Sequence, residues 1–401
     1  VGDAIAIYIE SIVPTSYGVA SGNDMTIEKN YNGDPFVAAK CPNCGTGLES
    51  KRYIKPTGFS PEAGRSLRRN EVREEFSYAT TPQLPVPNRE EDFNFNRIND
   101  NIQYAEAGNK QLIVLNRGSN LLGGFKMCKE CGFITPDYQK AKANSHKKPF
   151  LTYGNNKCDG VLETVYLGNA FTSDILLIRM KLSEKIDFDP KSPSIHDALE
   201  TIGEAFNIAT SRILEIDIDE INVGYRLYKD KENQFFADLY IFDSLSGGAG
   251  YSYVAGKYVR DILNELFNVL HDCSGNCDKA CYKCLKHYNN QFKHGILDRF
   301  LALDLITYIL KGNFRVYNNI YKTQMLSVIQ NMNNILGIES KLDKDKSELL
   351  LSDGTKIKVK NNIEKIPNKE NILFFSPYEI LNDLPNVHEK IKETLSITSV
   401  L

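Results

Sequence analysis

Residues 272–288 read DCSGNCDKACYKCLKHY and place four cysteines within a dozen positions, Cys273, Cys277, Cys281 and Cys284. Four thiolates in one short segment can surround a single tetrahedral Zn²⁺ ion, with bonds of about 2.3 Å. Four sulfur ligands leave no open position for water, and zinc has no redox chemistry. We therefore predict a structural zinc site in this four-cysteine segment, which clamps the preceding helix to the following one. An iron–sulfur cluster also takes four cysteines and is the alternative, although the short-spaced ferredoxin runs differ.

The regions around these cysteines predict a helix, a β-hairpin and two further helices. Apolar residues recur every three or four positions in the first helix, with Ser194 as its N-cap. The glycine-rich loop SGGAG at 246–250 precedes the second helix. We expect this loop to permit close helix approach; phosphate binding at the helix N-terminus is the alternative. The predicted elements cover about 194–213, 221–227, 235–242, 251–270 and 297–310.

Two further motifs, CPNCG at 41–45 and CKECG at 128–132, have the form of zinc-ribbon knuckles. Each knuckle of a ribbon supplies two ligands through a turn that glycine permits, and a long insertion would separate the two knuckles here. A local arrangement of three cysteines and one histidine competes with the ribbon. The spacing does not separate these two ligand sets, which are Cys41, Cys44, Cys128 and Cys131, or Cys128, Cys131, His146 and Cys158. Thioredoxin-like redox use is disfavoured, because glycine directly follows each motif.

The pattern along the chain predicts a multi-domain, zinc-stabilised α+β protein. The first part is β-rich and zinc-ribbon-like with a long polar insertion at 60–110, and its runs 161–167 and 174–180 are expected to pair as strands. A helix–hairpin–helix module that ends in the four-cysteine segment follows. The last part is a small α/β appendage in which Asp353 and Gly354 predict a hairpin turn. The three parts cover 1–190, 191–312 and 313–401.

The composition is that of a soluble globular protein. The 401 residues include 48 Lys and Arg against 51 Asp and Glu, so any DNA contact must use a local patch. Neither an apolar run of about 18 residues nor a secretory signal is present, which predicts no membrane segment and a cytoplasmic location. Paired cysteines in this setting favour metal over disulfides. Because the chain opens at Val1 without Met, we expect a fragment, a processed product or the ordered part of a longer protein.

Basic and aromatic residues alternate around the four-cysteine segment. Cations beside aromatic rings suit the backbone and bases of a nucleic acid, which predicts a DNA-binding face. The alternative is a solvated rim whose lysines offset the charge of the thiolates. The residues of the predicted face are Lys283, Lys286, Tyr288, Lys293 and Arg299.

Three motifs together resemble the MrfA-type zinc-binding (MZB) domain. They are DSLSGGAGY at 243–251, the four cysteines at 273–284 and YNNQFKHGILDR at 288–299. The resemblance covers about 190–312. This domain occurs at the C-terminal end of DEAD/DEAH-box superfamily-two helicases and in helicase partners such as DrmB of the DISARM antiphage system. By this resemblance the cysteines of the four-cysteine segment are zinc ligands.

The resemblance implies ATP-driven DNA translocation or unwinding, in antiphage defence or DNA repair. No Walker A motif, DEAD-like box or arginine-finger motif is found in this sequence. We therefore expect a noncatalytic zinc-binding module or subunit that contacts DNA and couples to an ATPase located elsewhere in the protein or in a partner. The alternative function is a scaffold for protein–protein assembly that makes no DNA contact.

Overall fold

The computed structural model describes residues 93–116, 124–135, 145–148, 157–187, 192–229 and 234–398, together with short strands and single positions outside these ranges. The candidate ligands Cys41 and Cys44 lie outside the described residues. The short strands of the first sixty residues are β1 (Ser11–Ile12), β2 (Ala20–Ser21), β3 (Thr26–Lys29), β4 (Pro35–Lys40), β5 (Gly47–Leu48) and β6 (Tyr53–Ile54).

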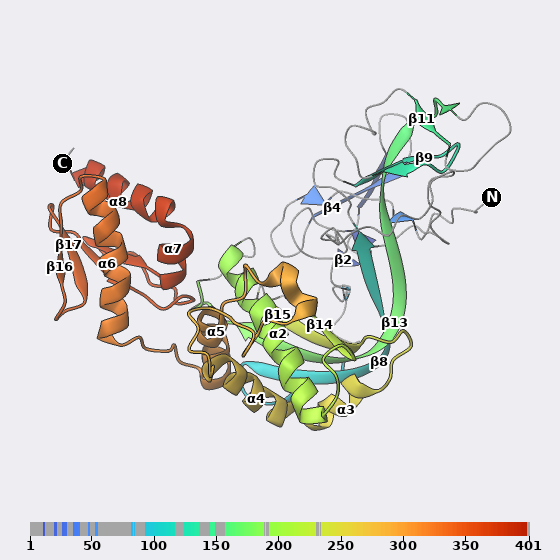
Figure 1. Cartoon of the computed structure of the whole chain (residues 1–401), viewed down its shortest axis with the longest axis horizontal. Helices are drawn as coiled ribbons and strands as arrows, with labels where there is room; N and C mark the ends of the chain where they lie inside the picture. The colour runs from blue at the N-terminus through green and yellow to red at the C-terminus, as the bar shows by residue number, and fades with distance from the viewer. Residues whose placement is uncertain are drawn as a thin grey trace.

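The longest strand, β13 (Leu162–Leu182), organises the main sheet (Figure 1). Its second half lies between β8 (Ile102–Asn116) and β15 (Phe235–Asp243), and β14 (Ile221–Lys229) pairs with the far side of β15. Its first residues, 162–165, extend beyond these strands and pair with β9 (Phe125–Cys128), while β8 continues along β13 from residue 167. The remaining strands of this part are β7 (Asn96–Arg97), β10 (Ile134–Thr135), β11 (His146–Lys147) and β12 (Lys157–Cys158).

The prediction that 161–167 and 174–180 form two paired strands is wrong. Residues 162–167 and 174–180 both belong to β13, which continues without a turn because β8 also pairs with the residues between the two runs. The register shifts between Ser173 and Ile175, so an irregularity in pairing marks the place where the sequence suggested a turn. The same pairing places strand β8 across residues 102–110, which the sequence assigned to the polar insertion.

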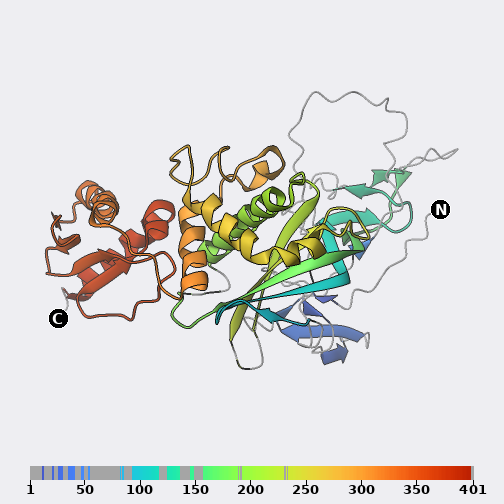
Figure 2. The same cartoon turned by 90° about the horizontal axis from the view of Figure 1, so that it is seen from below.

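Helices cover one face of this sheet (Figures 1 and 2). Alternate residues of β13, Leu176, Ile178 and Met180, are buried against them, as the period of a strand requires. The core formed in this way crosses residue 190, where the sequence suggested a domain boundary. The helices are α2 (Pro193–Leu214), α3 (Tyr251–Lys257), α4 (Val259–His271) and α5 (Arg299–Lys311).

Helix α2 begins one residue before the predicted N-cap. Its N-cap is Ser192, and Pro193 occupies the first helical turn, where its fixed φ and missing N–H are tolerated. The predicted second helix is divided at Tyr258 into α3 and α4. Gly256 of α3 packs against the side chain of Glu106 on β8, which occupies the space that a Cβ at this position would need.

The opposite face of the sheet carries a separate small core and a buried ion cluster. Ile175, Leu177 and Phe242 form this core with partly buried Phe93. Beside it, the Asp238 carboxylate accepts hydrogen bonds from two arginines. Arg179 Nε lies 2.9 Å from Asp238 Oδ1, and Arg226 Nη2 lies 2.9 Å from Asp238 Oδ2.

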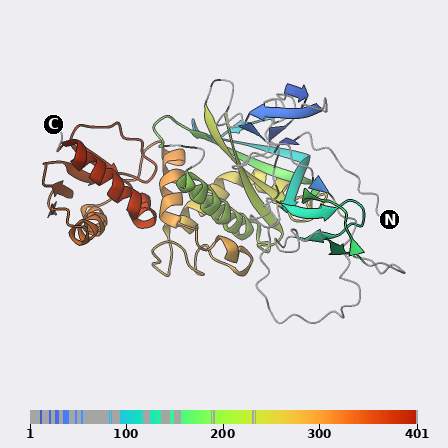
Figure 3. The same ribbon diagram turned by 90° about the horizontal axis from the view of Figure 1, so that it is seen from above.

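Residues after 312 form a further unit with its own hydrophobic core, at one end of the molecule (Figure 3). The predicted hairpin turn at Asp353–Gly354 is confirmed, with a positive φ of 88° at the glycine. Tyr378 Oη donates a hydrogen bond to Asp197 Oδ2 at 2.6 Å and so joins this unit to α2. Its elements are α6 (Asn319–Ile335), β16 (Ser340–Asp343), β17 (Glu348–Leu351), β18 (Lys356–Val359), β19 (Ile372–Phe375), α7 (Pro377–Asn382) and α8 (Leu384–Thr398).

The mixed helix and sheet content confirms the predicted α+β class. The order helix, hairpin, helices and four-cysteine segment is also confirmed. Among the helices in the described ranges, none combines the length and apolar character that a membrane span requires.

Candidate zinc sites and the surface beside them

The four cysteines between α4 and α5 converge on one point. The Sγ atoms of Cys273 and Cys281 are 3.5 Å apart, those of Cys277 and Cys284 are 3.7 Å apart, and those of Cys281 and Cys284 are 3.8 Å apart. A tetrahedral zinc ion with bonds of about 2.3 Å separates its sulfur ligands by about 3.8 Å. The spacing of the sulfurs therefore fits zinc.

Backbone N–H groups of the same segment point at the sulfurs. Gly275 N donates to Cys273 Sγ at 3.3 Å, and Lys283 N donates to Cys281 Sγ at 3.4 Å. Gly275 also leaves room for the cluster, because a Cβ at this position would lie 3.1 Å from Cys281 Sγ. These hydrogen bonds favour the thiolate form that binds metal.

The four sulfurs are too close together to ionise independently. Although burial raises the pKa of Cys273, hydrogen bonds from the backbone of Cys277 and Gly275 lower it to about 6. Burial and the neighbouring sulfurs of Cys273 and Cys284 instead raise the pKa of Cys277 to about 12. A divalent cation removes this conflict, because its charge favours the thiolate of every ligand.

Arg299 connects the loop that carries the four cysteines, the zinc loop, to both neighbouring helices. Its guanidinium donates to the carbonyl oxygen of Leu270 at 3.2 Å and to that of Cys277 at 3.1 Å. The side chain is buried, with 7% of its surface exposed. The expectation that Arg299 lies on an exposed DNA-binding face therefore does not match the structure, in which it closes the zinc loop onto the start of α5.

Lys293 is also engaged within the fold. Its ammonium lies 2.7 Å from Glu204 Oε1 and 2.9 Å from Glu200 Oε2, both on α2. Burial lowers the pKa of Lys293, but the charges of Glu200 and Glu204 outweigh it and raise that pKa to about 12. Lys293 thus anchors the 3₁₀ helix η3 (Tyr288–Lys293) to α2 and does not project toward solvent.

The zinc loop and η3 carry four exposed aromatic or basic side chains, which together we call the aromatic–basic surface. It consists of Tyr282, Lys283, Tyr288 and Phe292. The three aromatic side chains are 72%, 82% and 79% exposed, in sequence order. Lys286, the remaining lysine of the predicted face, is half-buried. The structure therefore brings Lys283 and Tyr288 of the predicted face to the surface, together with Tyr282 and Phe292, two of the aromatic residues that alternate with the basic residues in the sequence.

The phosphate-binding alternative for the SGGAG loop is not supported, because a side chain of the protein already occupies the place of an anion. The buried Asp243 carboxylate accepts hydrogen bonds from backbone N–H groups of Ala249, Gly250 and Ser252, at 2.5, 2.5 and 2.8 Å. It also accepts from Ser252 Oγ at 2.6 Å.

The SGGAG loop and the first turn of α3 form hydrogen bonds with β13 next to its register shift. Gly247 N donates to the Thr172 carbonyl at 2.9 Å, and Ser252 Oγ lies 2.9 Å from the carbonyl oxygen of Asp174. Gly248 has a φ of 84°, and a Cβ there would lie 2.9 Å from the Asp174 carboxylate. The sequence predicted that these glycines permit close approach of a helix, whereas in the structure they bring the loop close to β13.

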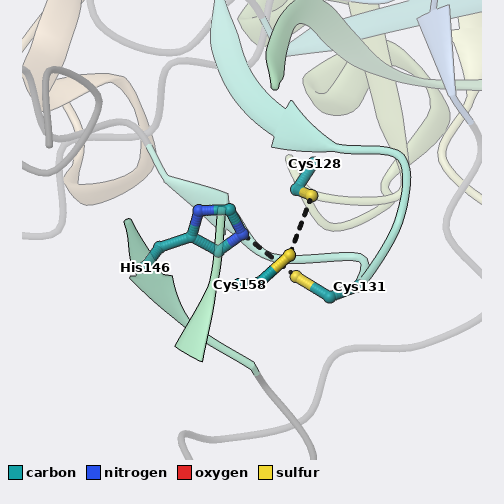
Figure 4. A group of neighbouring side chains, drawn as sticks. All are labelled: Cys128, Cys131, His146 and Cys158. Carbon is teal, nitrogen blue, oxygen red and sulfur yellow. Dashed lines mark hydrogen bonds between the residues drawn. The ribbon is translucent and has the colours of Figure 1, made fainter. Parts of the chain in front are cut away.

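A second group of possible ligands lies at the outer end of the sheet. Ligand atoms of Cys128, Cys131, His146 and Cys158 all lie within 4.8 Å of one another (Figure 4). This is the local set of three cysteines and one histidine, one of the two arrangements that the sequence left open. The ribbon arrangement depends on Cys41 and Cys44, which are not among the residues described.

The fold and the geometry of the four-cysteine segment define a protein with a structural zinc-binding module. Residues 203–285 match the MrfA Zn-binding domain family, so the chain contains this domain. The resemblance predicted from sequence is thereby confirmed, and so is zinc as the cofactor.

The chain is 36% identical over 287 residues to the Druantia protein DruE of Escherichia coli strain UMEA 4076-1. The alignment covers 68% of this chain and 16% of the length of DruE, so the chain corresponds to a small part of that relative. DruE is a Druantia protein, whereas the sequence had pointed to DISARM.

Among solved structures, the chain is similar to the DUF1998 helicase MrfA. The structure of MrfA bound to DNA aligns with a TM-score of 0.34 and 10% identity, and covers 75% of this chain and 30% of MrfA. Another MrfA structure aligns with a TM-score of 0.25 and 11% identity, over 71% of this chain and 33% of that one.

Proposed function

We propose that this chain is a noncatalytic, zinc-stabilised module of a bacterial DNA helicase complex, which contacts DNA and couples to an ATPase motor. The helicase-related MrfA Zn-binding domain and the Druantia relative support this class of protein. The Druantia relative favours antiphage defence over DNA repair.

The aromatic–basic surface is the observation that supports DNA contact. It presents three exposed rings and the cation of Lys283 on a loop and a 3₁₀ helix held by the four zinc-ligand cysteines and α2. Bases stack on exposed aromatic rings whatever the sequence, and a lysine neutralises a phosphate. This combination suits a single strand better than a duplex, because the bases of a duplex are already stacked.

The test is the salt dependence of binding to a labelled single-stranded oligonucleotide, measured by fluorescence anisotropy. Each phosphate contact contributes about 0.7 to the slope of log K against log salt for a single strand. The double variant Lys283→Ala/Lys286→Ala removes the exposed lysine of this surface and the half-buried lysine three residues later. It should bind more weakly at every sequence and reduce the slope by about 0.7 to 1.4, for one or two lost contacts. Zinc content should not change. The matched control is Lys341→Ala/Lys344→Ala, which removes two exposed lysines from the C-terminal unit.

Equal affinity and slope for both double variants would contradict DNA contact at this surface. That result would favour the scaffold function, because exposed rings such as Phe292 also suit a protein partner. Retention of an ATPase subunit by this chain in the absence of DNA, lost in Phe292→Ala, would identify such a partner surface.

A further inference from the structure

We propose that Cys128, Cys131, His146 and Cys158 bind a second zinc ion, through three thiolates and one imidazole. Cys128 Sγ and Cys158 Sγ are 3.8 Å apart, which is the separation of about 3.8 Å expected for two sulfurs on tetrahedral zinc. Cys131 Sγ lies 3.1 Å from His146 Nε2, a direct thiol–imidazole contact. Zinc would separate these two atoms to about 3.6 Å, a shift of about half an ångström.

The loop between β9 and β10 has the geometry of a metal-binding knuckle. Gly132 N donates to the Cys128 carbonyl at 3.0 Å, and Cys128 N donates to the Phe133 carbonyl at 2.8 Å. Gly132 has a φ of 74°, which favours glycine, as the sequence motif indicated. This turn presents Cys128 and Cys131 on the same side.

The strand pair β11–β12 presents the other two ligands. His146 and Cys158 are directly opposite each other in its register, so both side chains project from the same face. The imidazole is buried and stacks on Phe133, with ring centroids 4.7 Å apart. The position of Nε2 among the sulfurs is thus determined by both strand register and ring stacking.

The backbone at Gly160 also contacts the sulfur atoms of this group. Its N–H donates to Cys158 Sγ at 3.4 Å. A Cβ at this position would lie 2.7 Å from Cys128 Sγ, so any larger residue would displace a ligand. In a zinc site whose four ligands all come from the protein, the backbone packs closely around the sulfur atoms, as it does at Gly160.

The competing interpretation is that these are buried thiols packed within a small core. The neighbouring core contains only Phe125 and Val165 as buried hydrophobic residues within the described part of the chain. Burial on that scale contributes only a few kcal/mol, about 2–3 for each side chain. Four ligand atoms from two separate strand pairs would therefore converge with little apolar packing to hold them, whereas a metal ion supplies that energy directly.

Four protein ligands leave no open coordination position, so the second site is structural, and it binds zinc in preference to harder cations because three ligands are thiolates. It would join β9–β10 to β11–β12 at the outer end of β13. This inference does not depend on DNA binding or on a motor, and it uses no residue before Cys128.

The test is the zinc content of the purified full chain, measured by mass spectrometry, together with X-ray absorption at the zinc edge. The wild type should hold two zinc ions with seven sulfurs and one imidazole nitrogen between them. His146→Ala and Cys158→Ser should each lower the content to one. The control Cys41→Ser/Cys44→Ser should retain two.

Loss of one zinc from the control, with both ions retained in Cys158→Ser, would overturn the proposal and favour the ribbon. One zinc in the wild type would also overturn it. The absorption measurement needs no variant, so it decides the question even where a substitution prevents folding: a zinc shell of sulfur alone in the wild type rules out His146 as a ligand.

Discussion

Lys293 Nζ lies 2.7 Å from Glu204 Oε1, and this ion pair links the segment after the zinc loop to the middle of α2. Glu204 also accepts hydrogen bonds from Asn290 Nδ2 at 3.0 Å and from His287 Nε2 at 3.2 Å. Three donors of one short segment therefore share a single buried carboxylate. With these side chains turned inward, the rings of Tyr288 and Phe292 are left facing solvent.

Glu204→Gln should destabilise the protein at neutral pH. Burial opposes ionisation of Glu204, but the His287 hydrogen bond and the charge of Lys293 lower its pKa from 4.5 to about 2. A lowered pKa in the folded state stabilises the protein above the unfolded value, and this contribution is lost as pH falls from about 4.5 to about 2. We expect Glu204→Gln to cost about 2 kcal/mol at pH 7, measured by urea denaturation.

The difference between wild type and Glu204→Gln should shrink in this acid range. Zinc release in acid affects both proteins, so the comparison isolates the carboxylate. The exposed control Glu184→Gln should change the free energy of unfolding little at either pH. A constant difference from pH 7 to pH 3 would show that the charge of Glu204 is not what stabilises this segment.

Cys281→Ser should remove the zinc ion of the four-cysteine segment and unfold the surrounding helices. Zinc binding to a structural site contributes on the order of 10 kcal/mol, which is comparable to the stability of a whole domain. Loss of helical circular dichroism and of one zinc ion is the expected result. Ser274→Ala, at an exposed position of the same loop, is the control. Unchanged melting and zinc content in Cys281→Ser would show that it is not a ligand.

Tyr288→Ala/Phe292→Ala should weaken binding to single-stranded DNA more than binding to a duplex. Loss of base stacking costs about 1–3 kcal/mol for each base. The control Tyr253→Ala removes a 52% exposed ring from α3, which is part of neither the zinc loop nor η3, and should have no effect. Equal losses on single strand and duplex would argue against stacking.

Asp243→Ala should destabilise the protein by at least about 3 kcal/mol, because several donors lose one buried acceptor. Chemical denaturation followed by circular dichroism measures this effect, since the chain has no tryptophan. Asp345→Ala, in an exposed turn, is the matched control. Similar stability of the two variants would mean that water replaces the carboxylate.

The sequence predicted the elements whose residues repeat with a clear period. The apolar face of α2, the alternation in β14 and the apolar run of β15 can be read directly from the sequence, and so can the four-cysteine segment. The inward orientation of Lys293 and Arg299 is not visible, because basic residues at close spacing look alike whether they face water or a buried acceptor. Only the position of Glu204 on a distant helix, and of carbonyls at the end of α4, determines which of them are internal.

The second ligand set was undecided for a related reason. His146 and Cys158 are separated by a segment whose path the sequence does not reveal, so spacing alone treats His146 and Cys44 as equal candidates. The register of β11 against β12 is a tertiary fact, and it is what brings the imidazole to the sulfurs. Similarly, the sequence predicted two strands in place of β13 because glycine and asparagine at 168–169 interrupt the alternating pattern. In the structure, pairing with β8 keeps these residues within one strand.

The continuity of β13 has a mechanical consequence. Antiparallel hydrogen bonds lie perpendicular to the strands, so a force along β13 loads its ladder with β8 in shear, with many bonds sharing the load at once. A force applied at the second group of ligands (Cys128, Cys131, His146 and Cys158) would therefore be transmitted along β13 to the helical core without breaking the hydrogen bonds of the sheet one at a time. The β13–β8 ladder is weakest at the register shift beside Asp174. The hydrogen bonds from the SGGAG loop and the first turn of α3 to β13 at this position therefore reinforce the strand where its pairing is irregular.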